Sequence, residues 1–305
     1  QFLAMGFSDV QFDPYSFSGI NARNVVATLP GSVTPDNIYI LRGHPDSRAS
    51  GGGHDPAPGA NDNASGTASV LEAAAILANY QFESTIVFIA FTGEEQGLYG
   101  SAHYAAEAAS NNDNILGVVT CDMVAWWNNN WEIDIEGEVE YSALMQVMDD
   151  ACSEYTGLAT NQVFGSWGSD HVPFQNQGFP AFLAIEEEYG SYPCYHQACD
   201  VTDLNDGNFG VEVTRACLAT VAHLAGPLGL SISHTPLAST EDEVGPYEVI
   251  AGIQSVDPLI ADSLVLHYST GGAYVEAAMT ATGNPDEFHA FIPGQPSNTT
   301  ISYYI

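Results

Sequence analysis

The stretch from Phe88 to Ser101 places two adjacent carboxylates shortly after a predicted buried strand. Residues Ile86–Phe91 are apolar and partly β-branched, which is typical of a strand buried on both faces. The run ends at a Thr-Gly pair, and Glu94 and Glu95 follow. In open α/β sheets, ligands and catalytic groups collect at this carboxyl end of the strands. Because two neighbouring buried carboxylates are costly unless positive charge faces them, the stretch predicts a cation site.

The charge of the chain leaves few side chains that could supply the positive partner. The 305 residues include 38 acidic and four basic ones, and the formal net charge is −34. A metal ion is therefore a better partner for the two glutamates than a side chain. Without a basic cluster, the sequence argues against a nucleic-acid partner and against an anionic membrane surface. The acidic residues are expected to form a hydrated surface, with Ca²⁺-binding clusters as the alternative. The four basic residues are Arg23, Arg42, Arg48 and Arg215, and there is no lysine.

Neither a membrane span nor a signal peptide is expected from the sequence. No run of about 18 apolar residues occurs, which is what a transmembrane helix requires. Gln1–Leu3 lack the positively charged region that begins a signal peptide, and Gln1–Gly6 reads as an interior start, as if an earlier segment had been removed. Hydrophobic residues make up 45% of the chain and aromatic residues 11%, so a folded protein is expected despite the charge.

Five cysteines leave the disulfide pairing partly open. Cys194 and Cys199 bracket only four residues and could close a small disulfide loop. Cys152 and Cys217 both lie in helical patterns and could also pair, whereas Cys121 has the surroundings of a buried strand thiol. If Cys194 and Cys199 are oxidised, the protein belongs outside the cytoplasm, and we expect it to be secreted.

Strand-like and helix-like segments alternate through the first three quarters of the chain. Such alternation predicts an α/β fold with a mostly parallel central sheet and helices on both faces. A glycine-rich loop is expected over 50–59. The expected strands are 21–29, 37–42, 86–91, 115–120, 131–136 and 181–185, and the expected helices are 65–79, 97–109, 139–155, 170–175 and 211–224.

The pattern changes at Gly226-Pro227. Residues 231–246 are polar, acidic and contain proline, and beyond them lie only short alternating strands separated by turn residues. We therefore expect a first domain over 1–228, a linker over 229–246 and a small all-β sandwich over 247–305. The sandwich could dock substrates, attach the protein to a surface or mediate self-association. Its expected strands are 247–253, 263–268, 273–280, 287–292 and 299–305.

Five short stretches carry residue types that bind metals, each near a predicted strand end or loop. Taken singly, each has an ordinary explanation, such as a loop histidine or a helix cap. Taken together, two histidines and three carboxylates suit a pair of Zn²⁺ ions. The stretches are Gly43-His-Pro-Asp-Ser47, Pro58-Gly-Ala-Asn-Asp-Asn-Ala-Ser-Gly66, Gly93-Glu-Glu95, Cys121-Asp-Met123 and Cys194-Tyr-His-Gln-Ala-Cys-Asp200.

With these motifs in this order, the chain resembles the secreted two-zinc aminopeptidases, which include bacterial leucyl aminopeptidase, aminopeptidase S and yeast aminopeptidase Y. The resemblance covers about residues 20 to 225. It implies that Asp62 bridges two zinc ions. His44 and Asp122 would complete one zinc site, and Glu95 and His196 the other.

The same resemblance implies roles for three further residues. Glu94 matches the general base beside a hydroxide that bridges the two metals, and Asp46 matches a carboxylate that orients the site. Tyr195 matches a tyrosine that stabilises the oxyanion. In some relatives the peptide bond after the bridging aspartate is cis, which here is Asp62-Asn63. The segment Ser169-Asp170-His171, with Pro173-Phe174, matches one that shapes the cleft.

The substrate contacts stay open at this point. Before Ser169, around Trp167-Gly168, the arginine of some relatives is missing, and Asp170 and Glu186–Glu188 are candidates for holding the substrate α-ammonium. Glu186–Glu188 could equally form a solvated acidic loop. Aromatic residues near strand ends could line a side-chain pocket or simply pack. They are Trp126, Trp127, Phe164 and Tyr192.

The resemblance leads to a secreted metal-dependent aminopeptidase that acts on peptides. Carboxypeptidases and glutaminyl cyclases use the same scaffold, although the cyclases work with one zinc ion. A structural or filament-forming surface protein that has kept the site is a further alternative. The sequence does not decide between zinc, cobalt and manganese.

Overall fold

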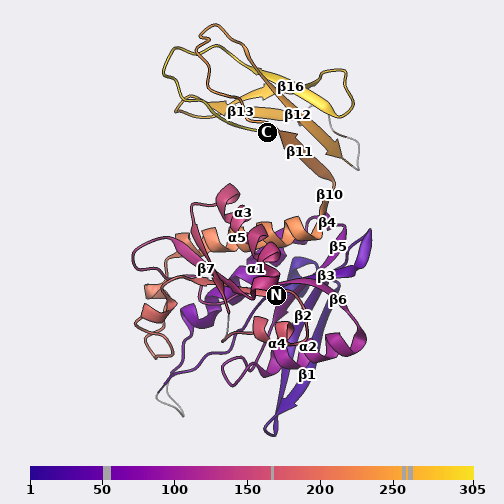
Figure 1. The fold of residues 1–305 in the computed structure, drawn as a ribbon, viewed down its shortest axis with the longest axis vertical. Helices are drawn as coiled ribbons and strands as arrows, with labels where there is room; N and C mark the ends of the chain where they lie inside the picture. The colour runs from indigo at the N-terminus through magenta and orange to yellow at the C-terminus, as the bar shows by residue number, and fades with distance from the viewer. Residues whose placement is uncertain (51–55, 166–167, 256–258, 260–263) are drawn as a thin grey trace. The chain divides into compact units, whose positions relative to one another are not determined.

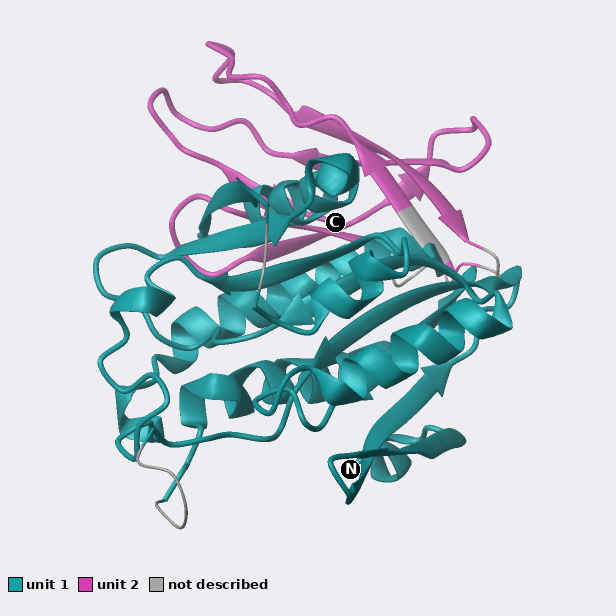
Figure 2. Cartoon of the chain, turned by 60° about the horizontal axis from the view of Figure 1, so that its bottom comes forward, with its two compact units in different colours: residues 1–227 teal, residues 228–305 magenta. Residues whose placement is uncertain are grey.

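The computed structural model describes residues 1–305 except 51–55, 166–167, 256–258 and 260–263. The chain forms two compact units, Gln1–Pro227 and Leu228–Ile305 (Figure 2). Half of the glycine-rich loop expected over 50–59 lies outside the described residues. Within the described part of the chain, no helix is long and apolar enough to cross a membrane.

An eight-stranded sheet forms the centre of the first unit, in the order β1-β2-β5-β3-β6-β9-β7-β8 (Figure 1). Four neighbouring strands, β5, β3, β6 and β9, run parallel, while β2 is antiparallel to β5 and β7 is antiparallel to β9. The mostly parallel α/β sheet expected from the sequence is thus confirmed, with antiparallel pairs toward both edges. The strands are β1 (Asp9–Phe17), β2 (Ile20–Leu29), β3 (Thr34–Gly43), β5 (Ser84–Ala90), β6 (Asn114–Cys121), β7 (Glu132–Gly137), β8 (Ala159–Phe164) and β9 (Ala181–Glu186), and the short β4 (Gln81–Phe82) lies outside this sheet.

Helices cover both faces of this sheet (Figure 1). On one face α1 (Gly66–Leu77), α3 (Ser142–Tyr155) and α5 (Gly207–Ala225) pack on a core that includes Phe88 and Ile135. On the other face α2 (Tyr99–Asn111) and α4 (His171–Asn176) pack on a core that includes Ile89 and Phe174. Strand residues alternate between the two cores, as expected for a sheet buried on both faces. Short helical turns are η1 (Phe2–Met5), η2 (Ala60–Ser65), η3 (Val139–Tyr141), η4 (Tyr189–Ser191) and η5 (Thr202–Leu204).

Both outer strands of the sheet were absent from the sequence prediction. β1 contains Pro14, and β8 contains Asn161 and Gln162, so neither has the apolar composition of a buried strand. Edge strands with one exposed side do not need that composition. Helix α5 also begins four residues before its expected start, because the Asp206 carboxylate accepts hydrogen bonds from the backbone of Asn208 and Phe209.

The second unit consists of two antiparallel sheets, in the orders β11-β12-β16-β15 and β14-β13-β17, around a separate apolar core. The expectation of a small all-β module is confirmed, but the expected linker over 229–246 needs correction. Residues Leu230–His234 form β11, paired with β12, because they alternate apolar and polar residues in the pattern of a strand. Ser263, the expected start of one strand, lies outside the described residues. The strands of these sheets are β11, β12 (Tyr247–Ser255), β13 (Val265–Ser269), β14 (Val275–Ala278), β15 (Thr280–Ala281), β16 (Glu287–Ile292) and β17 (Ser302–Tyr304), and the short β10 (Pro227–Leu228) lies where the chain passes from the first unit to the second.

Candidate metal centre

The candidate ligands gather where the parallel strands end. His44 directly follows β3, Glu95 follows β5, and Asp122 directly follows β6. His196 lies in the long loop after β9, and Asp62 lies in η2, just before α1. Because β3, β5, β6 and β9 are parallel, their carboxyl ends share one edge of the sheet, and loops from that edge bring the five side chains together.

A first group consists of His44, Asp62 and Asp122, which are all buried. His44 Nε2 lies 3.3 Å from Asp122 Oδ1 and 3.7 Å from Asp62 Oδ1. The other ring nitrogen, His44 Nδ1, lies 3.0 Å from the backbone oxygen of Asp46. A hydrogen bond from Nδ1–H to that oxygen leaves Nε2 free to act as a ligand.

A second group consists of Asp62, Glu95 and His196. His196 Nε2 lies 3.0 Å from Asp62 Oδ2 and 3.1 Å from Glu95 Oε2. Asp62 therefore points one carboxylate oxygen at His44 and the other at His196, so that it belongs to both groups. The guanidinium of Arg48, which the sequence did not indicate, lies 3.2 Å from Glu95 Oε2.

The charges in both groups favour a cation. Although burial favours the neutral ring of His44, the charge of Asp122 and its hydrogen bond raise the pKa of His44 well above its ordinary value. Burial likewise opposes protonation of His196, but hydrogen bonds to Asp62 and Glu95 raise its pKa to about 9. Each imidazole would thus hold a proton that a metal ion can replace, which makes metal affinity depend on pH.

The donor atoms fit zinc. Each group offers imidazole nitrogen and carboxylate oxygen, which are preferred zinc ligands together with thiolate. Glu95 Oε1 is buried and has no hydrogen-bond partner among the described residues, so a lone pair is free for an ion. A third group of this kind in the described part of the chain, Asp13, His103 and Glu107, is more exposed. The Ca²⁺ clusters considered from the sequence stay a prediction.

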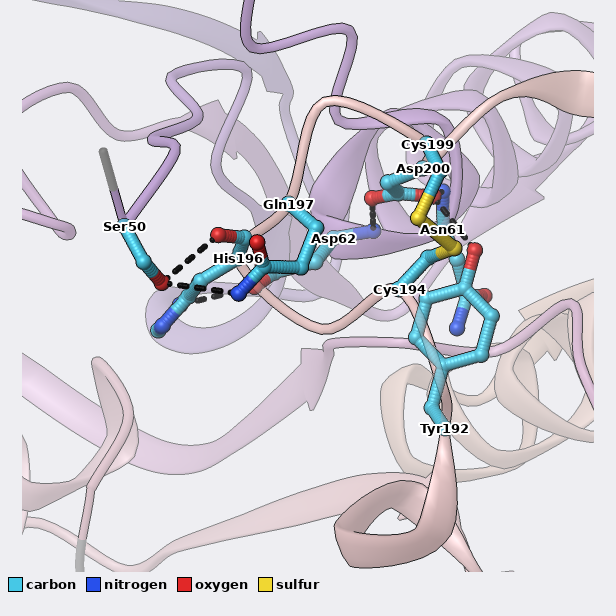
Figure 3. Close-up of a disulfide and its surroundings, with 9 residues drawn as sticks. All are labelled: Ser50, Asn61, Asp62, Tyr192, Cys194, His196, Gln197, Cys199 and Asp200. Carbon is cyan, nitrogen blue, oxygen red and sulfur yellow. Dashed lines mark hydrogen bonds and ion pairs between the residues drawn. A yellow bond between two sulfur atoms is a disulfide. The ribbon is translucent and has the colours of Figure 1, made fainter. Parts of the chain in front are cut away.

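Backbone hydrogen bonds hold the Asp62 loop from beneath. Asp200 Oδ1 accepts a hydrogen bond of 2.8 Å from the backbone N–H of Asn61, and Oδ2 accepts one of 3.0 Å from that of Asp62. The Tyr192 hydroxyl donates to Asp200 Oδ1 at 2.7 Å (Figure 3). Asp200 therefore positions the segment that carries the shared carboxylate, although Asp200 belongs to neither ligand group.

Replacement of Asp200 by asparagine is expected to weaken zinc binding by about 10–100-fold, because an amide nitrogen cannot accept one of the two backbone hydrogen bonds. Titration of the protein against a zinc-chelating indicator measures the change. Asp203→Asn, at an exposed position three residues later, serves as the control and should leave the affinity unchanged. Equal affinities for Asp200→Asn and the unmodified protein would contradict the positioning role.

Asn63 connects the Asp62 loop to the Asp122 loop. Its Nδ2 donates to the backbone oxygen of Cys121 at 2.9 Å, and its Oδ1 accepts from the backbone of Gly66 at 2.8 Å and of Met123 at 3.3 Å. The peptide bond Asp62-Asn63 is cis, as the resemblance implied. At Gly66 an added Cβ would lie 2.2 Å from the backbone oxygen of Cys121, so only glycine permits this close approach.

The disulfide between Cys194 and Cys199 is present and closes the small loop that carries His196 (Figure 3). Ser50 also holds this loop, since its backbone N–H donates a hydrogen bond to the backbone oxygen of His196 at 2.7 Å. The second candidate pair is wrong, because Cys152 and Cys217 are both free. Helix packing instead places Cys217 Sγ 3.2 Å from Cys121 Sγ.

The three residues expected to act in catalysis lie around the two groups. Asp46 Oδ2 accepts a hydrogen bond of 3.2 Å from the backbone of Glu95, so Asp46 touches the segments on both sides of the site. Glu94 Oε2 lies 3.8 Å from His44 Nε2. The Tyr195 ring stacks on the His196 ring with their centroids 3.8 Å apart.

Glu94 and Tyr195 both have shifted pKa values. Burial, together with the charges of Asp122, Asp170 and Glu95, raises the pKa of Glu94 to about 9, against the opposing effect of His44. Burial and the carboxylates of the site, Asp62 first among them, also raise the pKa of Tyr195. Both side chains therefore favour their protonated forms until positive charge enters the site.

A pocket of about 280 Å³ opens beside the two groups. Glu94, Asp122 and Tyr195 line it together with several apolar side chains. Glu136, on β7, also lines the pocket and was missed by the sequence analysis. The alternation Glu132-Ile-Asp-Ile-Glu136 could have indicated this position. Successive side chains of a strand point to opposite faces, so the carboxylates of β7 lie on the face opposite to its two isoleucines, which are in the core. The apolar lining residues are Leu98, Met123, Leu183, Ile185 and the aromatic Tyr189.

The residues considered earlier as substrate contacts do not line this pocket. Glu186 is buried and accepts hydrogen bonds from Asn61 Nδ2 at 2.7 Å and from the backbone of Trp126 at 2.9 Å. Glu188 accepts from the backbone of Asn128 and Asn129. These carboxylates support loops. Trp126, Trp127, Phe164, Tyr192, Asp170 and Glu187 are likewise absent from the lining.

Asp170 forms a buried ion pair beneath the pocket. Its Oδ2 lies 2.5 Å from Arg42 Nη1, and its Oδ1 accepts a hydrogen bond from the Ser101 hydroxyl. Arg42 Nε also donates to Thr120 Oγ1 at 2.7 Å. The neighbouring Ser169 hydroxyl donates to Asp122 Oδ2 at 2.7 Å. The Ser-Asp-His segment thus contacts the site through Ser169, while Asp170 secures it to the sheet.

Comparison with known proteins shows similarity to zinc-dependent peptidases. Residues 24–221 match the model of peptidase family M28. A probable zinc metalloprotease of Pyrenophora tritici-repentis is 44% identical over 290 residues, covering 76% of this chain and 60% of its own length. The chain thus spans about 60% of that relative.

Solved structures of aminopeptidases share the fold. The LapA aminopeptidase of Legionella pneumophila aligns with a TM-score of 0.64 and 23% identity, over 74% of this chain and 60% of its own. BSAP, a zinc aminopeptidase from Bacillus subtilis, aligns with a TM-score of 0.58 and 25% identity, over 70% of this chain and 52% of its own. Since the family model covers most of the first unit and includes all five candidate ligands, this chain belongs to peptidase family M28.

Proposed function

We propose that this protein is an aminopeptidase that uses two zinc ions to remove N-terminal residues from peptides. The observation that carries the proposal is Asp62, whose two carboxylate oxygens face different histidines and so join two ligand groups beside one pocket. Such an arrangement suits a pair of ions held close together. The similarity to the LapA aminopeptidase and to the zinc aminopeptidase BSAP supports the choice of reaction.

In this reaction Glu94, Tyr195 and Asp46 have different roles. When bound, two zinc ions would lower the pKa of the attacking water and polarise the scissile carbonyl. Glu94, beside the ligands but outside both groups, takes the proton of that water and passes it to the departing amine. Tyr195 donates a hydrogen bond to the oxyanion, and its raised pKa keeps the phenol protonated for this purpose. Asp46 holds His44 and Glu95 in position.

Hydrolysis of leucyl anilide and of its N-acetylated analogue, each with and without a zinc chelator, tests the proposal. We expect turnover of the free-amine substrate only, and we expect the chelator to abolish it. Hydrolysis of C-terminally unblocked, N-acetylated dipeptides would instead indicate a carboxypeptidase, and release of ammonia from an N-terminal glutamine peptide a cyclase. Zinc-loaded protein without any of these activities would point to a structural role.

We also propose that the protein acts outside the cytoplasm. The support is the Cys194–Cys199 disulfide, which closes the loop that carries a candidate ligand and would be reduced in most cytosols. Immunodetection in the culture fluid of the source cells checks this placement, and detection only in the cytosolic fraction would contradict it. We further propose that the second unit attaches the protein to a surface or mediates its self-association.

A further inference from the structure

Glu136 is a buried carboxylate that lines the pocket and lies outside both ligand groups. Its side chain is 7% exposed, and it lines the pocket together with candidate metal ligands and their neighbours. Among the residues that the structure describes, none donates a hydrogen bond to the Glu136 carboxylate or forms an ion pair with it. Burial, with the nearby charge of Asp134, raises the pKa of Glu136 to about 7. A carboxylate in this position lacks a positive partner.

No lysine or arginine side chain is free to supply that partner. The chain contains no lysine, and each of its four arginines is engaged elsewhere. Arg48 lines the same pocket, but its guanidinium pairs with Glu95. Because the arginines contact other residues, we expect a positive group opposite Glu136 to come from a bound molecule. The other three arginines contact Asp170 (Arg42), Glu212 (Arg215) and the ring of Phe12 (Arg23).

Apolar side chains line the same pocket as Glu136 and the ligand groups. Met123, Leu183 and Ile185 are almost fully buried, and they line the pocket with Tyr189. Such walls suit the methylene groups of a long side chain whose charged end lies further along. A substrate with an apolar stem and a cationic tip would match both the walls and Glu136.

The strand register gives the approximate distance between Glu136 and the strand that precedes Asp122. Glu136 on β7 pairs with Leu183 on β9, which pairs with Thr120 on β6, two residues before Asp122. Two strand spacings place Glu136 roughly 10 Å across the sheet from β6. The α-ammonium of a substrate lies next to the scissile carbonyl and cannot span that distance. A lysine side chain extends about 6 Å from its Cα, and the glutamate side chain covers much of the remainder.

We propose that Glu136 binds the cationic side chain of an N-terminal lysine or arginine, so that the enzyme prefers peptides with a basic first residue. This inference rests on the proposed aminopeptidase function and names its substrate class. Glu136 acts as a specificity residue at the end of the side-chain pocket and takes no part in bond cleavage.

Lysyl anilide and norleucyl anilide provide a matched test, because their side chains share a four-carbon stem and differ in the terminal ammonium. At pH 8 we expect the zinc-loaded enzyme to have at least a tenfold higher kcat/KM for lysyl anilide. Glu136→Gln should lower kcat/KM for lysyl anilide by about 30-fold and change that for norleucyl anilide by less than threefold. Glu140→Gln, an exposed carboxylate four residues later, is the control and should change neither value.

The outcomes separate this inference from the proposed function. Equal turnover of both substrates by the unmodified enzyme would overturn the inference and leave the aminopeptidase proposal intact. An equal loss for both substrates in Glu136→Gln would assign Glu136 to the α-ammonium or to the fold. If neither substrate is turned over, the function proposal fails, and calorimetric binding of lysinamide against norleucinamide still tests the pocket. Should Glu136→Gln not fold, Glu136→Asp keeps the charge, and we expect its shorter side chain to favour arginine over lysine.

Discussion

Replacement of Glu94 by glutamine is expected to lower kcat by about 10²–10⁴-fold while two zinc ions remain bound. The amide is isosteric with the carboxyl group but cannot take a proton from the attacking water. Glu94 is close enough to His44 to reach a water held between the ligand groups, yet it belongs to neither group. KM should change little, because the lost proton transfer occurs in the transition state.

Glu95→Gln is the matched comparison, since it makes the same chemical change one residue later. Glu95 lies 3.1 Å from His196 and has a free buried oxygen, so this variant should lose zinc from the second group. Zinc content measured by atomic absorption after dialysis, beside kcat, distinguishes the two. If Glu94→Gln loses metal as readily as Glu95→Gln, Glu94 is a ligand and the assignment of the base is wrong.

Replacement of Arg42 by methionine is expected to destabilise the first unit by about 3–5 kcal/mol. The change leaves Asp170 as a buried charge whose remaining partner is the Ser101 hydroxyl. It also removes the donor to Thr120. Breaking a buried ion pair from one side costs more than the pair contributes, because the uncompensated charge stays out of water. A loss of this size lowers the unfolding midpoint by about 10 °C.

Tryptophan fluorescence during urea unfolding measures this change in the first unit, because all four tryptophans lie within residues 126–167. The double variant Arg42→Met/Asp170→Leu removes both charges and should recover much of the stability. Arg215→Met is the control, since the Arg215 side chain is about half exposed and its pair with Glu212 should contribute less than about 1 kcal/mol. A loss in Arg42→Met no larger than in Arg215→Met would show that the buried pair does not secure the Asp170 segment.

Much of the fold could be predicted because its signals are local. The parallel strands have continuous apolar composition, so the positions of His44, Glu95 and Asp122 just after them followed from the sequence. The edge strands β1 and β8 lack that composition and were missed. Likewise, residues 230–234 belong to a strand whose partner lies some 20 residues later, and the acidic, proline-containing surroundings concealed it.

The partners of buried polar groups could not be predicted, because they depend on which segments meet in space. The sequence offered Asp170 as a substrate anchor. Its carboxylate instead forms an ion pair with Arg42, which lies 128 residues earlier in the chain. Glu186 was considered for the same role and instead supports the Asn61 loop. Glu136 could not be identified as a pocket residue from the sequence, because its position depends on which face of β7 lines the pocket.

The contacts of Asn63 bear on how the site would respond to a different ion. This one amide joins the backbone around Cys121 and Met123 to the start of α1, and Gly66 allows the two segments to touch. The segments that carry Asp62 and Asp122 are therefore fixed to one another by the chain itself. Exchange of zinc for cobalt or manganese would have to be accommodated by rotation of the carboxylate groups about their own bonds. The spacing between Asp62 and Asp122 in the first group is thus a property of the scaffold, and a metal bound there adapts to it.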